Sequence, residues 1–289
     1  MPEPTGRPAG RAPFGERLVA AMAARGPLCV GVDPHPSLLA AWGLTDDAEG
    51  LRRFSAAVLE GVADVAAALK PQVALYERHG SAGIAALEEL LAASADAGLL
   101  TIADAKRGDI GSTMAAYAQA WLGEGSPLAA DAVTLSPYLG FESLRPALET
   151  AAETGRGVFV LALTSNPEGA SVQHVGGDSS VARRVVDAAA AENGRYAGAQ
   201  RGHGSVGLVV GATVGDAIGR LGLDLAAMGG PILAPGLGAQ GATPAVLRET
   251  FGPAYPRVLG TSSRDILAGG PEPRGVRARA ERTLEGLRA

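Results

Sequence analysis

The chain has 289 residues, of which 47% are hydrophobic and 19% charged, a balance that excludes a disordered protein and is typical of a globular one. Its formal net charge of −5 indicates no basic surface, which argues against nucleic acid as a main partner. The single cysteine, Cys29, excludes an internal disulfide and fits a cytoplasmic protein, and no apolar run is long enough to span a membrane.

Short apolar runs alternate with alanine-rich helical stretches along the chain. Residues 1–13 are predicted to form a flexible lead-in to one domain over residues 14–289, whose first helix covers residues 16–25. Eight strands are predicted, at residues 28–33, 68–76, 99–104, 132–136, 158–164, 206–211, 231–235 and 257–261. Helical patterns fall between them, for example at residues 51–67, 83–97, 141–154 and 181–193.

Several of these strands are continuously apolar, as expected for a parallel sheet that is covered on both faces. Eight βα units predict an α/β fold, a single (β/α)8 TIM barrel whose bottom is closed by the helix at residues 16–25. A doubly wound open sheet is the main competitor. The count of eight favours the barrel, and so do the polar residues at the carboxyl ends of nearly all strands, where barrels carry their active sites.

The run LLTIADAKRGDIGST at residues 99–113 is the most informative part of the sequence. Its apolar start leads into Asp104 and Lys106, which share a face because residues i and i+2 of an extended chain point to the same side. Gly108 then lets the backbone turn, and Asp109 follows. Charges at the end of an apolar strand are costly to bury unless they neutralise one another, so the cluster predicts a site that controls charge. A surface salt bridge is the alternative.

Two further strands are predicted to add charges at the same end of the barrel. Asp33 ends the first strand, and Lys70 and Gln72 lie two residues apart on the second. Each lysine would then lie between carboxylates, which keeps lysines protonated and aspartates ionised. A fixed, protonated lysine can stabilise a developing carbanion and then donate a proton to it. Taken alone, Asp33 could be a turn residue and Lys70 a solvated strand end.

The loop APGLGAQGATP after the seventh strand predicts an anion site. Gly238 and Gly241 let the backbone approach a ligand closely. Thr243 and Pro244 are typical of a helix start, and helix N-termini attract anions. Arg264 follows the eighth strand and is suited to bidentate contact with phosphate, a group that many barrels bind after these two strands. Ordinary turns, with Arg264 paired to a surface acid, are the alternative.

The sequence LALTSNPEGASVQHVGG follows the fifth strand. Thr164 and Ser165 are placed to contact a polar ring, and the long loop behind them, which contains Gln173, is a candidate lid. The histidines and carboxylates show no metal-ligand spacing, so we predict no metal and assign no role to the four histidines. A divalent metal at Asp104 and Asp109 is an alternative that the neighbouring lysines argue against.

Residues 104–113, DAKRGDIGST, resemble the D-x-K-x-x-D-I-x-x-T signature of the orotidine 5′-phosphate decarboxylases. The resemblance extends over nearly the whole chain through the segments GVDP, LKPQ, TLSPYLG, LTSNP, APGLGAQG and TSSRDIL, and it is closest to the longer bacterial branch of the family, type 2. It implies a barrel enzyme that converts orotidine 5′-phosphate to UMP and CO2, the last step of de novo pyrimidine synthesis. It also implies that no metal or organic cofactor takes part.

The resemblance assigns a role to each residue that matches the signature. Lys106 would donate a proton to C6 of the pyrimidine, and Asp104 would lie beside the departing carboxylate. Asp33 and Lys70 would hold ribose hydroxyls and complete the charge network, helped by Gln72.

Further residues are implied to bind the rest of the substrate. Asp109 and Thr113 would reach across a homodimer interface into the neighbouring subunit's site, and Ser165 with Thr164 would contact the pyrimidine edge. The residues implied to hold the phosphate are Gly238, Gln240, Gly241 and Arg264.

Two other functions remain alternatives. A related barrel, a Mg²⁺-dependent decarboxylase or aldolase-like synthase that acts on a sugar phosphate, has a similar D-x-K-x-x-D run. A non-catalytic barrel that binds a nucleotide is the second, although every charged position of the signature is occupied here. The sequence also leaves open whether the lid follows strand five or strand seven, and whether Gln173 contacts the substrate.

Overall fold

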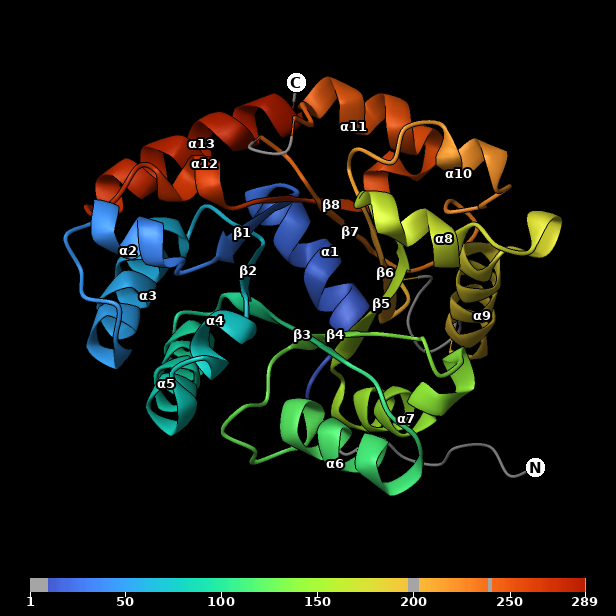
Figure 1. The fold of residues 1–289 in the computed structure, drawn as a ribbon, viewed down its shortest axis with the longest axis horizontal. Helices are drawn as coiled ribbons and strands as arrows, with labels where there is room; N and C mark the ends of the chain where they lie inside the picture. The colour runs from blue at the N-terminus through green and yellow to red at the C-terminus, as the bar shows by residue number, and fades with distance from the viewer. Residues whose placement is uncertain (1–9, 197–202, 239–240, 289) are drawn as a thin grey trace.

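Eight parallel strands form a closed barrel in the computed structural model of the chain, which describes residues 10–196, 203–238 and 241–288 (Figure 1). Each strand pairs with the next one along the chain, and β8 pairs with β1, so the predicted barrel is confirmed and the open sheet is excluded. The strands are β1 (Leu28–Val32), β2 (Ala68–Pro71), β3 (Leu100–Arg107), β4 (Ala132–Leu135), β5 (Gly157–Leu163), β6 (Val206–Val210), β7 (Ile232–Pro235) and β8 (Val258–Ser262).

Helices surround the barrel and connect its strands (Figure 1). The α-helices are α1 (Phe14–Arg25), α2 (Pro36–Ala41), α3 (Ala48–Val62), α4 (Ala74–Glu77), α5 (Gly80–Asp96), α6 (Gly111–Leu122), α7 (Arg145–Thr154), α8 (Ala170–Gln173), α9 (Val181–Arg195), α10 (Ala217–Arg220), α11 (Pro244–Phe251), α12 (Arg264–Leu267) and α13 (Pro273–Arg288). The 3₁₀ helices in the described part of the chain are η1 (Phe141–Leu144), η2 (Pro167–Gly169), η3 (Gly177–Ser179) and η4 (Gly252–Arg257). Among the described residues, no helix is both long and apolar enough to cross a membrane.

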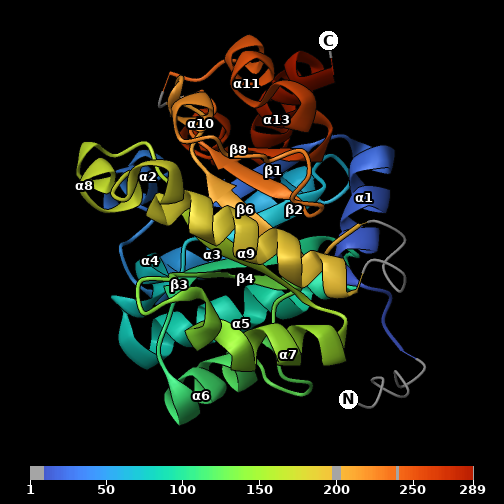
Figure 2. The same cartoon turned by 90° about the vertical axis from the view of Figure 1, so that its right-hand side faces the viewer.

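Helix α1 closes the amino-terminal end of the barrel, as predicted. Its Phe14 and Leu18 are buried in one cluster with inward-facing strand residues such as Ile102 and Phe159. The rings of Phe14 and Phe159 meet edge to face at 5.8 Å, and Gly157 provides the room, because a Cβ there would lie 2.2 Å from the Phe14 ring. Figure 2 shows α1 at one end of the barrel and α8 and α2 at the other. Helix α1 thus leaves the carboxyl ends of the strands, where barrels carry their active sites, as the expected place of a functional site.

Strand β2 ends at Pro71, so the strand predicted at residues 68–76 is confirmed for its first part and wrong beyond Pro71. Helix α4 occupies the last part of this segment, because the N–H groups of Tyr76 and Glu77 donate to the backbone oxygen of Val73. Tyr76 is fully buried, and its hydroxyl lies 2.7 Å from that of Ser55. Buried apolar residues are common to strands and short core helices, so the pattern alone did not separate the two.

Strand β3 is longer than predicted and continues past Asp104 to Arg107. Its ladder with β4 is irregular between Ala103 and Arg107, and Lys106 has a backbone φ of 49°. This left-handed conformation costs a non-glycine residue about 1–2 kcal/mol, so other contacts have to hold Lys106 in place.

The helix start predicted at Thr243 and Pro244 is confirmed. The Thr243 hydroxyl accepts the N–H of Val246, and Pro244 is the first residue of α11. Most of the predicted lead-in lies outside the described residues, and within residues 10–13 the guanidinium of Arg11 donates to the backbone oxygen of Thr154 at 3.0 Å.

Candidate active site

A cavity of about 250 Å³ opens at the carboxyl ends of the strands. One part of the cavity is lined by charged side chains, which come from β1 to β3 and from the residues that follow these strands. Another part is apolar and is lined by Leu161, Val209 and Leu233 of β5, β6 and β7. The residues predicted from the sequence that line it are Asp33, Lys70, Gln72, Asp104, Lys106, Thr164 and Arg264. Charges beside an apolar wall act at low dielectric, where their interactions are stronger than in water.

Asp104 is the centre of the charged part. Lys70 Nζ donates to Oδ2 of Asp104 at 2.7 Å, and Lys106 Nζ donates to Oδ1 at 2.6 Å. The side chains of Lys70 and Asp104 are only 8% and 10% exposed, whereas that of Lys106 is 44% exposed. The buried pair is therefore a fixed support, and Lys106 is the member of the group that is accessible to a ligand.

Opposite charges govern the protonation of the buried pair. Burial alone would raise the pKa of Asp104, but Lys70 and Lys106 outweigh it and hold the pKa of this carboxyl well below its usual range. Burial alone would lower the pKa of Lys70, but the carboxylates of Asp104 and Asp33 outweigh it and raise that pKa above its ordinary value. Both groups are therefore charged at neutral pH, as the sequence predicted.

Gln72 and Asp33 extend the group. With its amide nitrogen turned towards Asp104, Gln72 donates to the backbone oxygen of Asp104 at 2.9 Å and to Oδ2 at 3.1 Å. Asp33 Oδ2 accepts from the Ser263 hydroxyl at 2.5 Å, whereas its Oδ1 is buried without a hydrogen-bond partner among the described residues. An ionised oxygen in this state is an acceptor for hydroxyl donors of a ligand.

Thr164 lines the cavity at the end of β5, and the loop behind it is fastened to it. Gln173 Oε1 accepts the N–H of Thr164 at 2.8 Å, and Gln173 Nε2 donates to Thr164 Oγ1 at 2.7 Å. Thr164 Oγ1 in turn lies 2.6 Å from Asn166 Oδ1. Ser165 is exposed next to Thr164, but it is not one of the residues that line the cavity.

The predicted phosphate residues are distributed unevenly around the cavity. Arg264 lines it and forms no ion pair with a described residue, so the alternative of pairing with a surface acid is not observed there. The N–H of Gly238 donates to the backbone oxygen of Ala242 at 2.8 Å, and the N–H of Gly241 donates to that of Gly238 at 2.7 Å. Both N–H groups serve the turn itself. Gln240 lies outside the described residues.

Asp109 and Thr113 do not line this cavity. The Asp109 carboxylate accepts the N–H of Ile110 at 2.8 Å, and Thr113 is exposed in the first turn of α6.

The sequence did not predict Ser263 or Thr134, which hydrogen-bond with the charged residues of the site. Ser263 donates to Asp33, and the hydroxyl of Thr134 in β4 lies between Lys106 and Asp104. A lone threonine in an otherwise apolar strand was the only local signal for Thr134. Ser263 lies in the run TSSRDIL, where only Arg264 was singled out.

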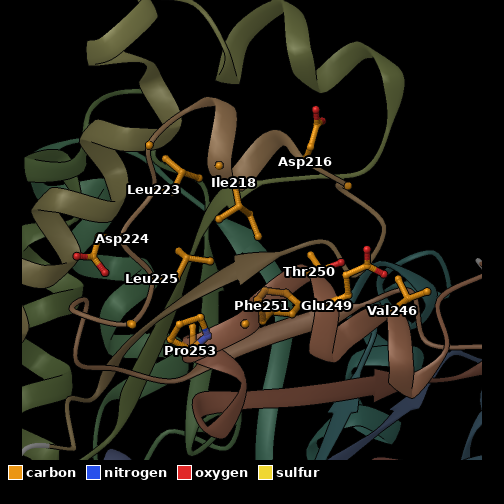
Figure 3. A pocket seen from close by; sticks show the side chains of 16 residues that line it. Asp216, Ile218, Leu223, Asp224, Leu225, Val246, Glu249, Thr250, Phe251 and Pro253 are labelled. Atoms are coloured by element: carbon orange, nitrogen blue, oxygen red, sulfur yellow. The ribbon is translucent and has the colours of Figure 1, made fainter.

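A larger cavity of about 810 Å³ lies between α10 and α11, away from these charges (Figure 3). Figure 3 shows apolar side chains there, including Ile218, Leu225 and Phe251, with Asp216 and Glu249 near its edges. The described residues that line it include no lysine or arginine, so they offer no positive charge for a phosphorylated or carboxylated ligand. The smaller cavity is therefore the candidate active site, although the other one is wider.

Comparison with known proteins identifies the family of the chain. The model of the orotidine 5′-phosphate decarboxylase / HUMPS family matches residues 26–254. Proteins named orotidine 5′-phosphate decarboxylase from Salinispora arenicola and Streptomyces coelicolor are 56% and 54% identical, over 96% and 93% of this chain and 97% and 95% of theirs. A crystal structure from Streptomyces avermitilis, also named as that of an orotidine 5′-phosphate decarboxylase, matches with a TM-score of 0.91 at 52% identity, over 99% of this chain and 98% of that one. The chain therefore belongs to the orotidine 5′-phosphate decarboxylase / HUMPS family.

Proposed function

We propose that this enzyme decarboxylates orotidine 5′-phosphate to UMP and CO2, the last step of de novo pyrimidine synthesis, without a metal or organic cofactor. The observation that carries the proposal is the contact of Lys106 Nζ with Asp104, which itself bonds buried Lys70. The curated relatives described above carry the same activity in their names.

The charges suit the chemistry of this reaction. Loss of CO2 leaves an electron pair on C6 of the pyrimidine, and the ring stabilises it poorly. The ammonium group of Lys106 is already fixed beside Asp104, so it can meet the developing charge without reorganisation and then donate its proton to C6. Asp104 would lie beside the substrate carboxylate, and repulsion between the two anions favours departure of CO2.

The remaining residues would bind the parts of the substrate that do not react. Asp33, whose Oδ1 is buried without a partner among the described residues, and Lys70 would hold ribose hydroxyls. Thr164 and Ser165 would contact the pyrimidine edge. The phosphate would be held by Arg264, Gln240 and the loop around Gly238 and Gly241, and binding of this remote group helps to orient the ring.

We further propose that the enzyme acts as a homodimer in which Asp109 and Thr113 complete the neighbouring site. The carboxylate of Asp109 is engaged with its own loop and does not line the cavity of its own subunit. Three large apolar side chains in the loops after β3 and β4 are exposed, namely Ile110 (62%), Tyr138 (80%) and Leu139 (53%). Such a patch next to functional residues is typical of an interface.

A cytoplasmic location is part of the same proposal. The one cysteine, Cys29, is buried and free, which fits a reducing compartment. Burial raises the pKa of its thiol to about 12, so Cys29 is not a nucleophile at neutral pH. Cell fractionation followed by an activity assay tests the location, and recovery of the activity outside the cytoplasmic fraction would contradict it.

Turnover of orotidine 5′-phosphate, followed by the ultraviolet absorbance of the pyrimidine, tests the function. We expect the wild type to be active with and without EDTA. Lys106→Ala should lose at least about a thousandfold in kcat/KM, because the preorganised ammonium group supplies several kcal/mol of transition-state stabilisation. Lys106→Ala should also keep its fold, since this side chain is the accessible one of the group.

Three outcomes would contradict the proposal in different ways. Loss of wild-type activity in EDTA would indicate the Mg²⁺-dependent chemistry of a sugar-phosphate enzyme. Tight UMP binding by a wild type without turnover would indicate a non-catalytic nucleotide-binding barrel. An active Lys106→Ala enzyme would remove Lys106 from the reaction.

A further inference from the structure

The hydroxyl of Thr134 connects the backbone of Lys106 to the carboxylate that holds its ammonium group. Thr134 lies in β4 and is fully buried. Its Oγ1 accepts the backbone N–H of Lys106 at 2.9 Å and donates to Oδ1 of Asp104 at 3.0 Å. The same Oδ1 accepts from Lys106 Nζ at 2.6 Å. Three hydrogen bonds therefore close a ring that holds both ends of Lys106.

Lys106 depends on this ring because the sheet does not hold it there. The ladder between β3 and β4 is irregular from Ala103 to Arg107, and the N–H of Lys106 bonds to a side chain of β4. Lys106 is also the one non-glycine residue with positive φ in residues 10–196, 203–238 and 241–288. Such a conformation persists only where surrounding contacts stabilise it. Here the Thr134 hydroxyl provides such a contact, because it accepts the backbone N–H of Lys106.

The hydroxyl also determines how Asp104 faces the two lysines. A threonine hydroxyl has one proton to donate, and here it goes to Oδ1, the oxygen that receives Lys106. Oδ2 receives Lys70. Each carboxylate oxygen thus has its own partners, and rotation of the carboxyl group would break both contacts at Oδ1.

We propose that Thr134 is a positioning residue for the decarboxylation, fixing the backbone of Lys106 and the orientation of Asp104 so that the ammonium group is already in place when charge develops on the substrate. The inference rests on the proposed function. Thr134 does not line the cavity, so it acts through Lys106 and Asp104 and leaves the contacts of Asp33 and Arg264 with the ligand intact. Its loss should therefore lower kcat more than it raises KM.

Thr134→Val, which removes the hydroxyl and keeps the shape, tests this role beside Thr134→Ser, which keeps the hydroxyl. We expect kcat to fall about 10- to 100-fold in Thr134→Val, as for lost hydrogen bonds to a charged group, with KM and the Kd for UMP within about threefold of the wild type. Thr134→Ser should recover kcat to within about threefold of the wild type, because it restores both hydrogen bonds. If Thr134→Val does not fold, Thr134→Ala is assayed by the same criteria.

Thr101→Val is the matched control. Thr101 is a buried threonine of β3 whose hydroxyl bonds Asp131 at 3.2–3.3 Å, away from the lysines. The Thr101→Val enzyme should keep the wild-type kcat, since the loss of this buried hydroxyl can lower stability but does not disturb Lys106 or Asp104. A folded Thr134→Val enzyme with wild-type kcat would overturn the proposal, and so would a Thr134→Ser enzyme as slow as Thr134→Val. A Thr134→Val enzyme whose KM rises by the same factor as its kcat falls would also overturn it.

A crystal structure of Thr134→Val separates this inference from the proposed function. If the wild type itself shows no turnover, the function fails, but the position of Lys106 can still be examined. Departure of the Lys106 backbone from positive φ, or loss of the contact between Lys106 Nζ and Asp104, would support the positioning role. Retention of both would overturn it.

Discussion

Among the single residues of the site, Asp104 is the one whose loss we expect to cost the most stability. It is nearly buried, and it carries the counter-charge of a lysine that is more deeply buried still. Removing one partner of such a pair leaves an uncompensated charge inside the protein, which is far more costly than losing an exposed ion pair.

Asp104→Asn should therefore lose stability as well as activity. We expect the free energy of unfolding to fall by about 3–5 kcal/mol, because Lys70 stays buried without its anion, and urea denaturation at pH 7 measures this. Asp64→Asn is the control, since Asp64 forms an exposed ion pair with Arg277 and should change stability little. An Asp104→Asn protein as stable as the wild type would contradict the view of a tightly coupled buried pair.

The same pair predicts how stability depends on pH. The folded-state pKa of Asp104 is lowered, so its contribution is complete above the unfolded pKa of about 3.9 and is lost as pH falls below it. The folded-state pKa of Lys70 is raised, so its contribution is complete below about 10.4 and is lost as pH rises above it. On acidification, the wild type should consequently lose more stability than Asp104→Asn, which has no carboxyl group to protonate at this position.

The sequence predicted Asp33, Lys70, Asp104 and Lys106 because each lies at the end of a recognisable apolar strand. In a barrel, such ends meet around one opening. Thr134 could not be predicted in the same way. Its hydroxyl matters only because the backbone of the neighbouring strand departs from regular pairing at Lys106, and a single sequence does not mark that departure.

Among the elements, strands two and three show what strand prediction could and could not provide. The apolar runs in the sequence correctly predicted the eight strands of the barrel and their order. The boundaries of the strands depended on local contacts that the runs do not show. Strand two was predicted too long because residues 73–76 are apolar in a helical turn as they would be in a strand. Strand three was predicted too short because charged residues usually end a strand, but here they line a cavity.

Gln173 fastens the loop after β5 to Thr164 with two hydrogen bonds, so a change at Gln173 tests the role of this loop. Gln173→Ala removes both hydrogen bonds to Thr164, so we expect faster hydrogen exchange at the Thr164 amide and a KM several-fold higher. Ser171→Ala is the control, since Ser171 is exposed in the same loop and donates only to the backbone oxygen of Glu168. If Gln173→Ala matched this control in both measurements, the loop would have no part in binding.

The arrangement of the whole molecule separates two kinds of surface around one opening. The charged residues come from β1 to β3, the apolar wall from β5 to β7, and Arg264 from the end of β8. A ligand with a phosphate and an acidic ring would therefore contact nearly the full circle of strands. Asp109 and the exposed apolar side chains lie in the loops after β3 and β4, and Thr113 lies in the first turn of α6; none of them lines the cavity.

Mixing two inactive variants tests whether that surface completes a second subunit's site. Lys106→Ala and Asp109→Ala homodimers should each be inactive. In a mixed dimer, one site would lack both side chains and the other would have both, so unfolding and refolding an equal mixture should recover about a quarter of the wild-type activity, as for random C2 dimers. If Asp109 served its own subunit, each site in the mixed dimer would lack one side chain and the mixture would stay inactive. Sedimentation of the wild type should show a dimer, and a monomer with full activity would contradict the shared site.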